Sequence, residues 1–144
     1  MIESQILQPV VVLAAWTMIM WAWMYATRIP AISREGLTPK QARRTGTLDQ
    51  ALPEHVQWKA HNYNHLHEQP TVFYAVALVL AMVGLGDGMN ALLAWIYVGL
   101  RIIHSLVQVT ANVVMVRFVL FAVSSLVLIV LIFDAAVAIF DTSI

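Results

Sequence analysis

The chain of 144 residues is 60% hydrophobic and only 11% charged, and its formal net charge is zero. Soluble domains carry about a quarter charged residues, so this composition excludes a surface that faces water on all sides. The lack of cysteine excludes a disulfide framework, a thiolate metal site and a cysteine nucleophile, and the charge balance does not indicate a nucleic-acid partner. We expect one integral membrane domain over residues 1–144.

The first predicted helix covers residues 7–27. Its apolar stretch from Leu7 to Ala26 has 20 residues, which at about 1.5 Å per residue spans the roughly 30 Å hydrocarbon core of a bilayer. A cleaved signal peptide needs a positively charged start and a short apolar run, whereas the only charge before Arg28 is Glu3. We therefore interpret this segment as a membrane anchor that is retained.

Residues 28–53 form a predicted polar loop. Six of the eight Lys and Arg residues lie between Arg28 and Gln69, and the positive-inside rule places such a basic stretch in the cytoplasm. Within the loop, Thr38 is predicted to cap a short helix that begins at Pro39. Four membrane crossings would leave both termini outside the cytoplasm.

Three further helices are predicted after the loop. The second helix covers residues 54–86, with a cytoplasmic extension and a kink at Pro70, and the third and fourth cover residues 90–112 and 113–140. A glycine-rich turn separates the second from the third, while the third and fourth are joined so closely that they should form an antiparallel hairpin. The chain is therefore predicted to be all-α, an antiparallel up-down bundle of four membrane helices.

The third helix carries a polar stripe on an otherwise apolar sequence. At about 100° per residue, its five polar side chains fall within roughly 100° of arc; they are Arg101, His104, Ser105, Gln108 and Asn112. An arginine inside a membrane costs several kcal/mol unless it is paired or hydrated, so the stripe is a candidate functional site. A structural alternative is that Arg101 pairs with Glu68 and that the amides bridge helices.

A second polar cluster precedes the predicted membrane entry of the second helix, in the sequence HNYNHLHEQPTVFY from His61 to Tyr74. His61, His65 and Glu68 fall on one helical face, a spacing that can hold zinc. A hydrogen-bonding network for a polar ligand explains the same residues, as does a solvated start of a helix at the interface. We assign no metal site here.

Arg117, near the start of the fourth helix, is a third candidate. It is either a residue whose charge reaches the membrane interface or a guanidinium that stabilises a bound thiolate. Because the link between the third and fourth helices returns to the side of the basic loop, Arg117 can meet Arg101, His104 and the polar end of the second helix.

Taken together, these residues resemble the MAPEG family, the membrane-associated proteins in eicosanoid and glutathione metabolism. The resemblance covers nearly the whole chain. Its most specific parts are Glu68 with Phe73 five residues later, the Arg-x-x-His pair of Arg101 and His104, and Arg117 sixteen residues after Arg101. Members of the family are homotrimers that bind glutathione between subunits near the cytoplasmic side.

The resemblance implies a role for each candidate residue. Glu68, Arg101 and His104 would hold the charged and amide groups of glutathione, and Arg117 would stabilise its thiolate. Further binding positions follow from the alignment; they are Arg28 at the end of the first helix, Asn64 and His65 where the family has Arg-Asn, and Gln108 where it often has Tyr. The second-helix motif is closer to a bacterial branch of the family, which implies the bacterial inner membrane.

The predicted function is a glutathione-dependent membrane transferase or peroxidase that acts on lipophilic electrophiles or hydroperoxides. Because the chain lacks cysteine, the thiol must come from glutathione as a co-substrate. The alternative is a non-catalytic membrane binding or scaffold protein with the same fold. The polar residues Glu68, Arg101, His104 and Arg117 favour the enzyme. A four-helix multidrug transporter is disfavoured because it normally needs an acidic residue within the membrane.

Overall fold

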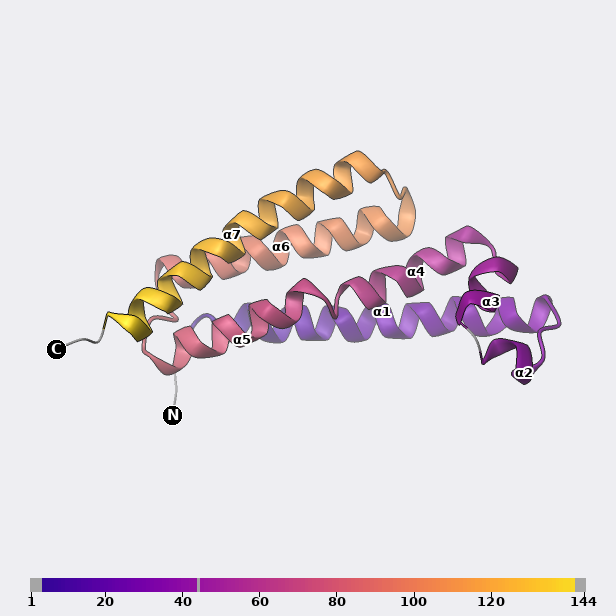
Figure 1. The fold of residues 1–144 in the computed structure, drawn as a ribbon, viewed down its shortest axis with the longest axis horizontal. Coiled ribbons are helices and arrows are strands. Elements are labelled where there is room, and N and C mark those ends of the chain that lie inside the picture. Colours follow the sequence, from indigo (N-terminus) through magenta and orange to yellow (C-terminus); the bar gives the residue numbers. More distant parts are fainter. Residues whose placement is uncertain (1–3, 44, 142–144) are drawn as a thin grey trace.

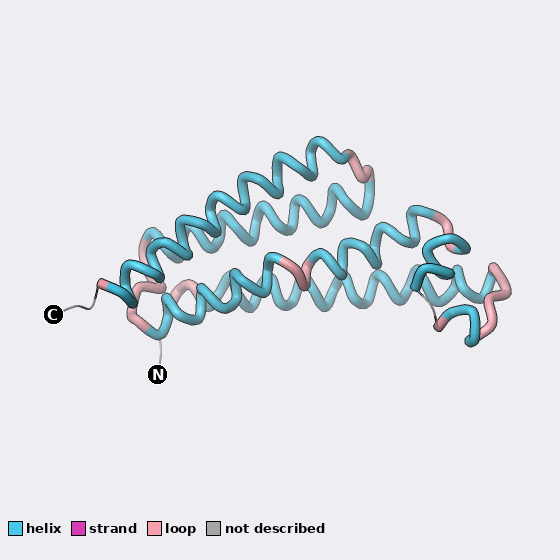
Figure 2. Tube along the Cα trace, viewed as in Figure 1, coloured by secondary structure: helices cyan, strands magenta, loops and turns pink. Residues whose placement is uncertain are grey.

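The computed structural model describes residues 4–43 and 45–141, and within those ranges every regular element is a helix. Figures 1 and 2 show long helices lying side by side, with the short ones gathered at one end of the molecule. In chain order the helices are α1 (Leu7–Arg34), α2 (Pro39–Ala42), α3 (Thr45–Ala51), α4 (Glu54–His65), α5 (Gln69–Met82), α6 (Met89–Thr110) and α7 (Val114–Phe140).

Three of the described helices are long and apolar enough to cross a membrane; these are α1, α6 and α7. Large apolar side chains stand exposed along them, with Met115 70% and Phe133 65% exposed. Apolar surface on this scale is unstable against water and matches the hydrocarbon of a bilayer. The expectation of an all-helical integral membrane protein is therefore confirmed.

The first helix is longer than predicted, because it continues past Thr27 to Arg34. Pro30 lies inside it and removes one backbone donor, but the following residues gain packing that offsets this loss. Ala31 joins a small second core with Leu48, Leu52 and Val56, so the end of α1 is fixed by α3 and α4. Arg28 consequently lies within a helix and not at the start of a loop.

The predicted helix over residues 54–86 is interrupted at residues 66–68, which separate α4 from α5. Pro70 occupies the first turn of α5, where the missing backbone donor costs little. The backbone of Glu68 leaves the helical region at φ −87° and ψ −103°, and its carbonyl accepts a hydrogen bond of 2.6 Å from the Thr71 hydroxyl. The proline therefore starts a new helix where a kink was expected.

The short helix after Thr38 is confirmed. Pro39 begins α2, and the Gln41 side chain accepts hydrogen bonds from the Thr38 backbone N–H at 3.0 Å and from its hydroxyl at 2.8 Å. This reciprocal arrangement at the first turn is a capping box.

The hairpin of α6 and α7 is also confirmed, and the two helices lie antiparallel along most of their length (Figure 1). Asn112 allows the tight reversal by adopting a left-handed backbone with φ of +49°, a conformation that asparagine tolerates better than most residues. Its backbone N–H donates to the Val107 carbonyl at 2.7 Å. The link also lies toward the end of the molecule that carries α2 and α3 (Figure 1).

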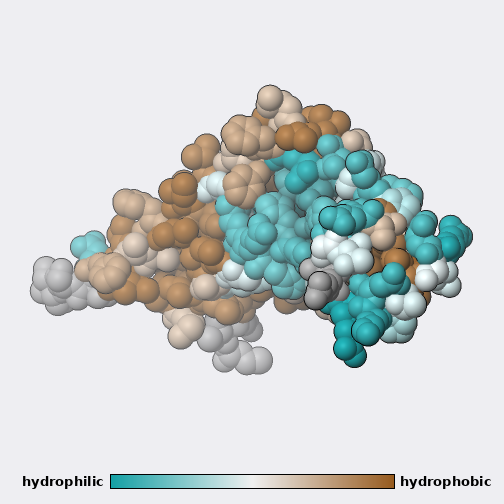
Figure 3. Space-filling view, turned by 45° about the vertical axis from the view of Figure 1, so that its right-hand side comes forward, coloured by the Kyte–Doolittle hydropathy of each residue, from teal (hydrophilic) through white to brown (hydrophobic). Residues whose placement is uncertain are grey.

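A core of apolar side chains joins α1, α5, α6 and α7, with Leu13, Phe73, Leu80 and Leu131 fully buried. The rings of Phe73 and Tyr97 stack with centroids 4.5 Å apart, an offset arrangement that aromatic pairs favour. This packing fills the end of the molecule opposite to α2 and α3. On the surface, hydrophilic residues cover the α2–α3 end of the molecule and hydrophobic residues cover the other end (Figure 3).

The start of the described chain is fixed against the turn between α5 and α6. The Ile6 backbone N–H donates to the Gly86 carbonyl at 2.8 Å, and the Gln5 N–H donates to the Asp87 carboxylate at 2.8 Å. A Cβ at Gly86 would overlap the Ser4 hydroxyl and lie 2.7 Å from the Ile6 side chain. The glycine is required here by this close approach.

We therefore predict that Gly86→Ala lowers the free energy of unfolding by about 1–3 kcal/mol, as overpacking of a tight contact does. The measurement is thermal or denaturant unfolding of the detergent-solubilised protein by circular dichroism. Gly99→Ala is the matched control, because a Cβ there meets nothing within 4 Å. Its stability should be unchanged or raised by up to about 1 kcal/mol, and equal destabilisation of both variants would contradict the explanation.

Candidate functional site

The polar stripe of α6 lies on the face of the helix that packs inward. The buried face begins with apolar and aromatic residues and becomes polar in its second half, where the buried side chains are Arg101, His104, Ser105 and Gln108. They are between 0% and 4% exposed. The predicted common face is therefore confirmed. Asn112, at the reversal, is half-buried.

Arg101 is the largest fully buried side chain, at 1% exposure. Within the described chain, none of its three guanidinium nitrogens has a hydrogen-bond partner. Its Cζ lies 5.6 Å from the centroid of the Phe121 ring on α7, close enough for a cation–π attraction. The ion pair of Arg101 with Glu68 is not formed among the described residues, where the Glu68 carboxylate contacts His65 instead.

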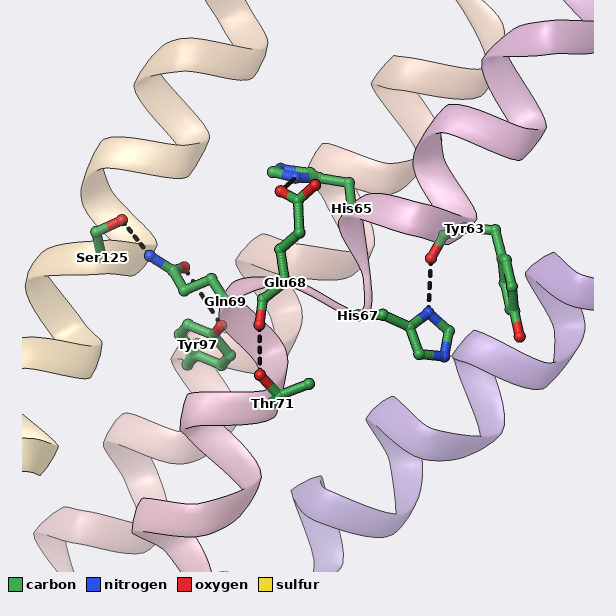
Figure 4. A network of polar contacts seen from close by, with 8 residues as sticks. All are labelled: Tyr63, His65, His67, Glu68, Gln69, Thr71, Tyr97 and Ser125. Carbon is green, nitrogen blue, oxygen red and sulfur yellow. Dashed lines mark hydrogen bonds and ion pairs between the residues drawn. The ribbon is translucent and has the colours of Figure 1, made fainter. Parts of the chain in front are cut away.

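His65 and Glu68 meet at the interruption between α4 and α5. The imidazole Nδ1 of His65 lies 2.8 Å from the Glu68 carboxylate (Figure 4). The His65 ring is half-buried, with its centroid 5.0 Å from that of His104 and 5.7 Å from that of Phe121. Burial is the main cause that lowers the pKa of His65; Arg101 and Arg117 lower it further, while Glu68 opposes them.

An open pocket of about 250 Å³ lies beside this pair. Its lining combines polar and apolar side chains, which are His65, His104, Val114, Arg117, Phe118 and Phe121. The apolar side chains belong to the outer face of α7, where Val114 is 72% and Phe118 64% exposed. The pocket can therefore contact both a polar and a lipophilic group.

Arg117 lines the pocket from the first turn of α7. Its Nη1 donates to the Asn112 side-chain oxygen at 2.6 Å, while its Nε is buried without a partner in the described structure. Asn112 thus has two roles, since the residue that reverses the chain also orients the guanidinium. Sequence periodicity placed Asn112 in the stripe but did not indicate this contact.

The predicted binding position at Asn64 is not brought to the pocket, because its side chain is exposed. The buried asparagine is Asn62, whose side-chain N–H donates to the Ser105 hydroxyl at 2.6 Å. Trp16 on α1 donates to the same hydroxyl at 3.0 Å, so Ser105 joins three helices. The helical spacing of Asn62 from Val56, Lys59 and Leu66, which are all buried, is the signal that could have identified it.

A second polar network was not predicted and supports the start of α5. The Gln69 amide donates to the Ser125 hydroxyl at 2.7 Å and accepts a hydrogen bond of 3.3 Å from Tyr97 (Figure 4). It links α5 to α6 and α7 next to the His65–Glu68 pair. A single glutamine beside a proline carries no pattern that would have indicated this role.

Three further predicted residues are not among those that line the pocket; they are Gln108, Arg28 and His61. Gln108 is buried, and its side-chain oxygen has no partner among the described residues. Arg28 is half-buried on α1 and does not line the pocket. His61 turns away and lies 3.8 Å from Asp49, and the described residues contain no group of three or more His, Cys, Asp or Glu side chains able to hold a metal ion.

Comparison with protein-family models gives a match to the MAPEG family over residues 6–137. The chain belongs to the MAPEG family. The match covers the helices that carry every residue of the pocket, and it confirms the family resemblance drawn from the sequence. Membership suggests a glutathione-related function at a membrane for this MAPEG chain. Neither the curated proteins nor the solved structures contain a match to it.

The Ser105 hydroxyl gives a stability prediction for this MAPEG chain. Ser105→Ala leaves the Trp16 indole N–H and the Asn62 amide without their acceptor, and unsatisfied buried donors cost about 1–3 kcal/mol. We expect the free energy of unfolding in detergent to fall by that amount. Thr110→Ala is the matched control, because Thr110 is exposed on the same helix and its hydroxyl donates to the Leu106 carbonyl. A similar loss in both variants would contradict the role of Ser105.

Proposed function

We propose that this MAPEG chain is a glutathione-dependent membrane transferase or peroxidase that acts on lipophilic electrophiles or hydroperoxides. The observation that carries the proposal is Arg101, a buried guanidinium whose nitrogens have no partner in the described chain. A buried charge of this kind destabilises the protein unless an opposite charge lies beside it. An anionic ligand supplies that charge, and the carboxylates of glutathione fit the requirement.

Two further buried polar atoms, one on α6 and one on α7, support the same ligand. The Gln108 side-chain oxygen and the Arg117 Nε are buried without partners among the described residues, so both can bind a peptide that has amide donors and carboxylate acceptors. Together with His104 and Glu68 they would hold glutathione with its thiol near Arg117. These side chains come from α6, α7 and the interruption before α5.

The chemistry follows from the polar and apolar side chains of the pocket. Glutathione supplies the thiol, and the guanidinium of Arg117 would favour its ionised form through charge. A lipophilic electrophile would enter along the exposed apolar residues of α7, from the bilayer. In a transferase reaction a carbon–sulfur bond forms and the leaving group departs with its electron pair. In a peroxidase reaction the oxygen–oxygen bond of the hydroperoxide breaks to give an alcohol and water, which take up the two thiol protons, and the two glutathione molecules are oxidised to the disulfide.

The assembly is part of the proposal. We place α5 as a fourth membrane crossing with α4 as its cytoplasmic extension, and we place the basic segment and the α6–α7 link in the cytoplasm and both termini outside. A homotrimer would bring Arg28 of a neighbouring subunit toward the pocket, which Arg28 does not reach within one chain. A bacterial inner membrane is the proposed location.

The first test combines glutathione titration with thiolate absorbance on the detergent-solubilised protein. Glutathione should raise the unfolding temperature, because a ligand present at 100 times its Kd stabilises by about 2.7 kcal/mol. Arg117→Ala should reduce the thiolate signal at neutral pH at least about tenfold, since a nearby cation lowers a thiol pKa by about 1–3 units.

Arg43→Ala is the matched control, because Arg43 is exposed at the end of α2 and far along the chain from the pocket. It should leave both the thermal shift and the thiolate signal at wild-type values. If glutathione produces neither a shift nor a thiolate signal in the wild type, the enzyme is excluded and the non-catalytic binding or scaffold protein takes its place.

Sharing of the site between subunits is tested by co-expressing Arg28→Ala with Arg117→Ala. Each variant alone should be inactive toward a model electrophile. In mixed trimers, about a quarter of the sites would combine an intact Arg28 with an intact Arg117 from the neighbouring subunit, because cyclic symmetry pairs each subunit with the next. Activity that stays at the background of the separate variants would contradict a shared site.

A further inference from the structure

We propose that His65, oriented by Glu68, is the base that accepts the thiol proton in this pocket. This inference rests on the proposed glutathione-dependent function and adds a catalytic residue to it. Arg117 can stabilise a thiolate, but an arginine keeps its own proton and cannot accept another. The proton of the bound thiol therefore needs an acceptor within reach, and the pocket contains two candidates, His65 and His104.

The contact with Glu68 prepares His65 for this task. The carboxylate lies 2.8 Å from Nδ1, so it accepts a hydrogen bond from Nδ1–H and leaves the lone pair on Nε2 free to accept a proton. A base whose ring is oriented by a carboxylate is the general arrangement for activating a nucleophile. Glu68 follows His65 by three residues, a spacing that places the carboxylate beside the ring at the end of α4.

The position of His65 is also suitable. Its ring lines the same pocket as Arg117, between the rings of His104 and Phe121. The sulfur that Arg117 would hold is therefore near the imidazole. Neighbouring His67 is a useful contrast, because its Nδ1 contacts the Tyr63 carbonyl at 2.8 Å and its ring is turned away from Glu68 (Figure 4).

His104 is the weaker candidate for the base. It lies 3% exposed one turn from Arg101 on the same helix, and a second positive charge so close to a buried guanidinium is unfavourable. The carboxylate that would compensate such a charge contacts His65 instead. His104 therefore suits a role as a hydrogen-bonding group for the ligand, and His65 suits proton transfer.

The charged groups around His65 determine how its protonation follows pH. Glu68 contacts it directly, Arg101 and His104 face it from α6, and Arg117 faces it from α7. Burial and the two arginines lower its pKa from the usual 6.5, so the imidazole is mainly neutral at pH 7. It can accept a proton in that state, and it loses this ability as the pH falls through its pKa.

The step balances as a simple proton transfer. The sulfur–hydrogen bond of the thiol breaks, both electrons stay on sulfur, and the proton joins Nε2 of His65. The resulting imidazolium is paired with the Glu68 carboxylate while the thiolate lies beside Arg117. Glu68 is 67% exposed, so water at its surface can take the proton away once the product forms.

The experiment is stopped-flow mixing of the full-length detergent-solubilised protein with glutathione, with thiolate absorbance recorded across pH. In the wild type, the rate constant of thiolate formation should fall at low pH, as His65 becomes protonated. His65→Gln keeps a hydrogen-bond donor for Glu68 but cannot accept the proton. It should slow thiolate formation about 100-fold or more and abolish the acidic limb, with glutathione affinity close to wild type.

Chemical rescue separates a base from a structural residue. Added imidazole should restore the rate of His65→Ala in proportion to its concentration, which it would not do for a merely misfolded pocket. His67→Gln is the matched control and should keep the wild-type rate and pH profile.

The outcomes are distinct. A wild type that forms no thiolate overturns the proposed function together with this inference. A wild type that forms the thiolate, with a His65→Gln variant of unchanged rate and pH profile, overturns the role of His65 alone. Loss of the acidic limb in His104→Gln and not in His65→Gln would assign the base to His104 and overturn the inference as well.

Discussion

The burial of one positive charge determines how the polar half of this molecule is organised. Arg101 lies on a helix that is long and apolar enough to cross the membrane, at 1% exposure. A guanidinium in such surroundings requires aromatic faces, polar neighbours or an anion. The neighbouring elements supply the first two: Phe121 faces it from α7, and buried polar residues continue along α6. An anionic ligand would supply the third.

The interruption between α4 and α5 is the second determinant of the site. Glu68 contacts His65 at the end of α4, and the Gln69 network holds the new helix against α6 and α7. Polar side chains that would be costly singly in an apolar environment are thereby paired.

The sequence was sufficient to predict the features that depend on periodicity and composition. The apolar runs identified α1, α6 and α7, and the spacing of Arg101, His104 and Gln108 placed them on one face, since helical geometry alone fixes both. The end of α1 was less predictable, because Pro30 favours termination locally while the packing of Ala31 on α3 and α4 overrides it. Asn62 and Asn64 are identical residues two positions apart, and the helical spacing of Asn62 from the buried Val56 and Leu66 is the pattern that distinguishes the buried one.

The contact between Arg101 and Phe121 also bears on how the chain enters the bilayer. Both residues belong to the α6–α7 hairpin, whose helices are separated by residues 111–113. So short a link means that the two helices can insert as a pair. The guanidinium thus has an aromatic neighbour within its own hairpin, independent of α1 and α4. The cation–π contact with Phe121 would therefore offset part of the free-energy cost of moving Arg101 into the bilayer when the hairpin inserts.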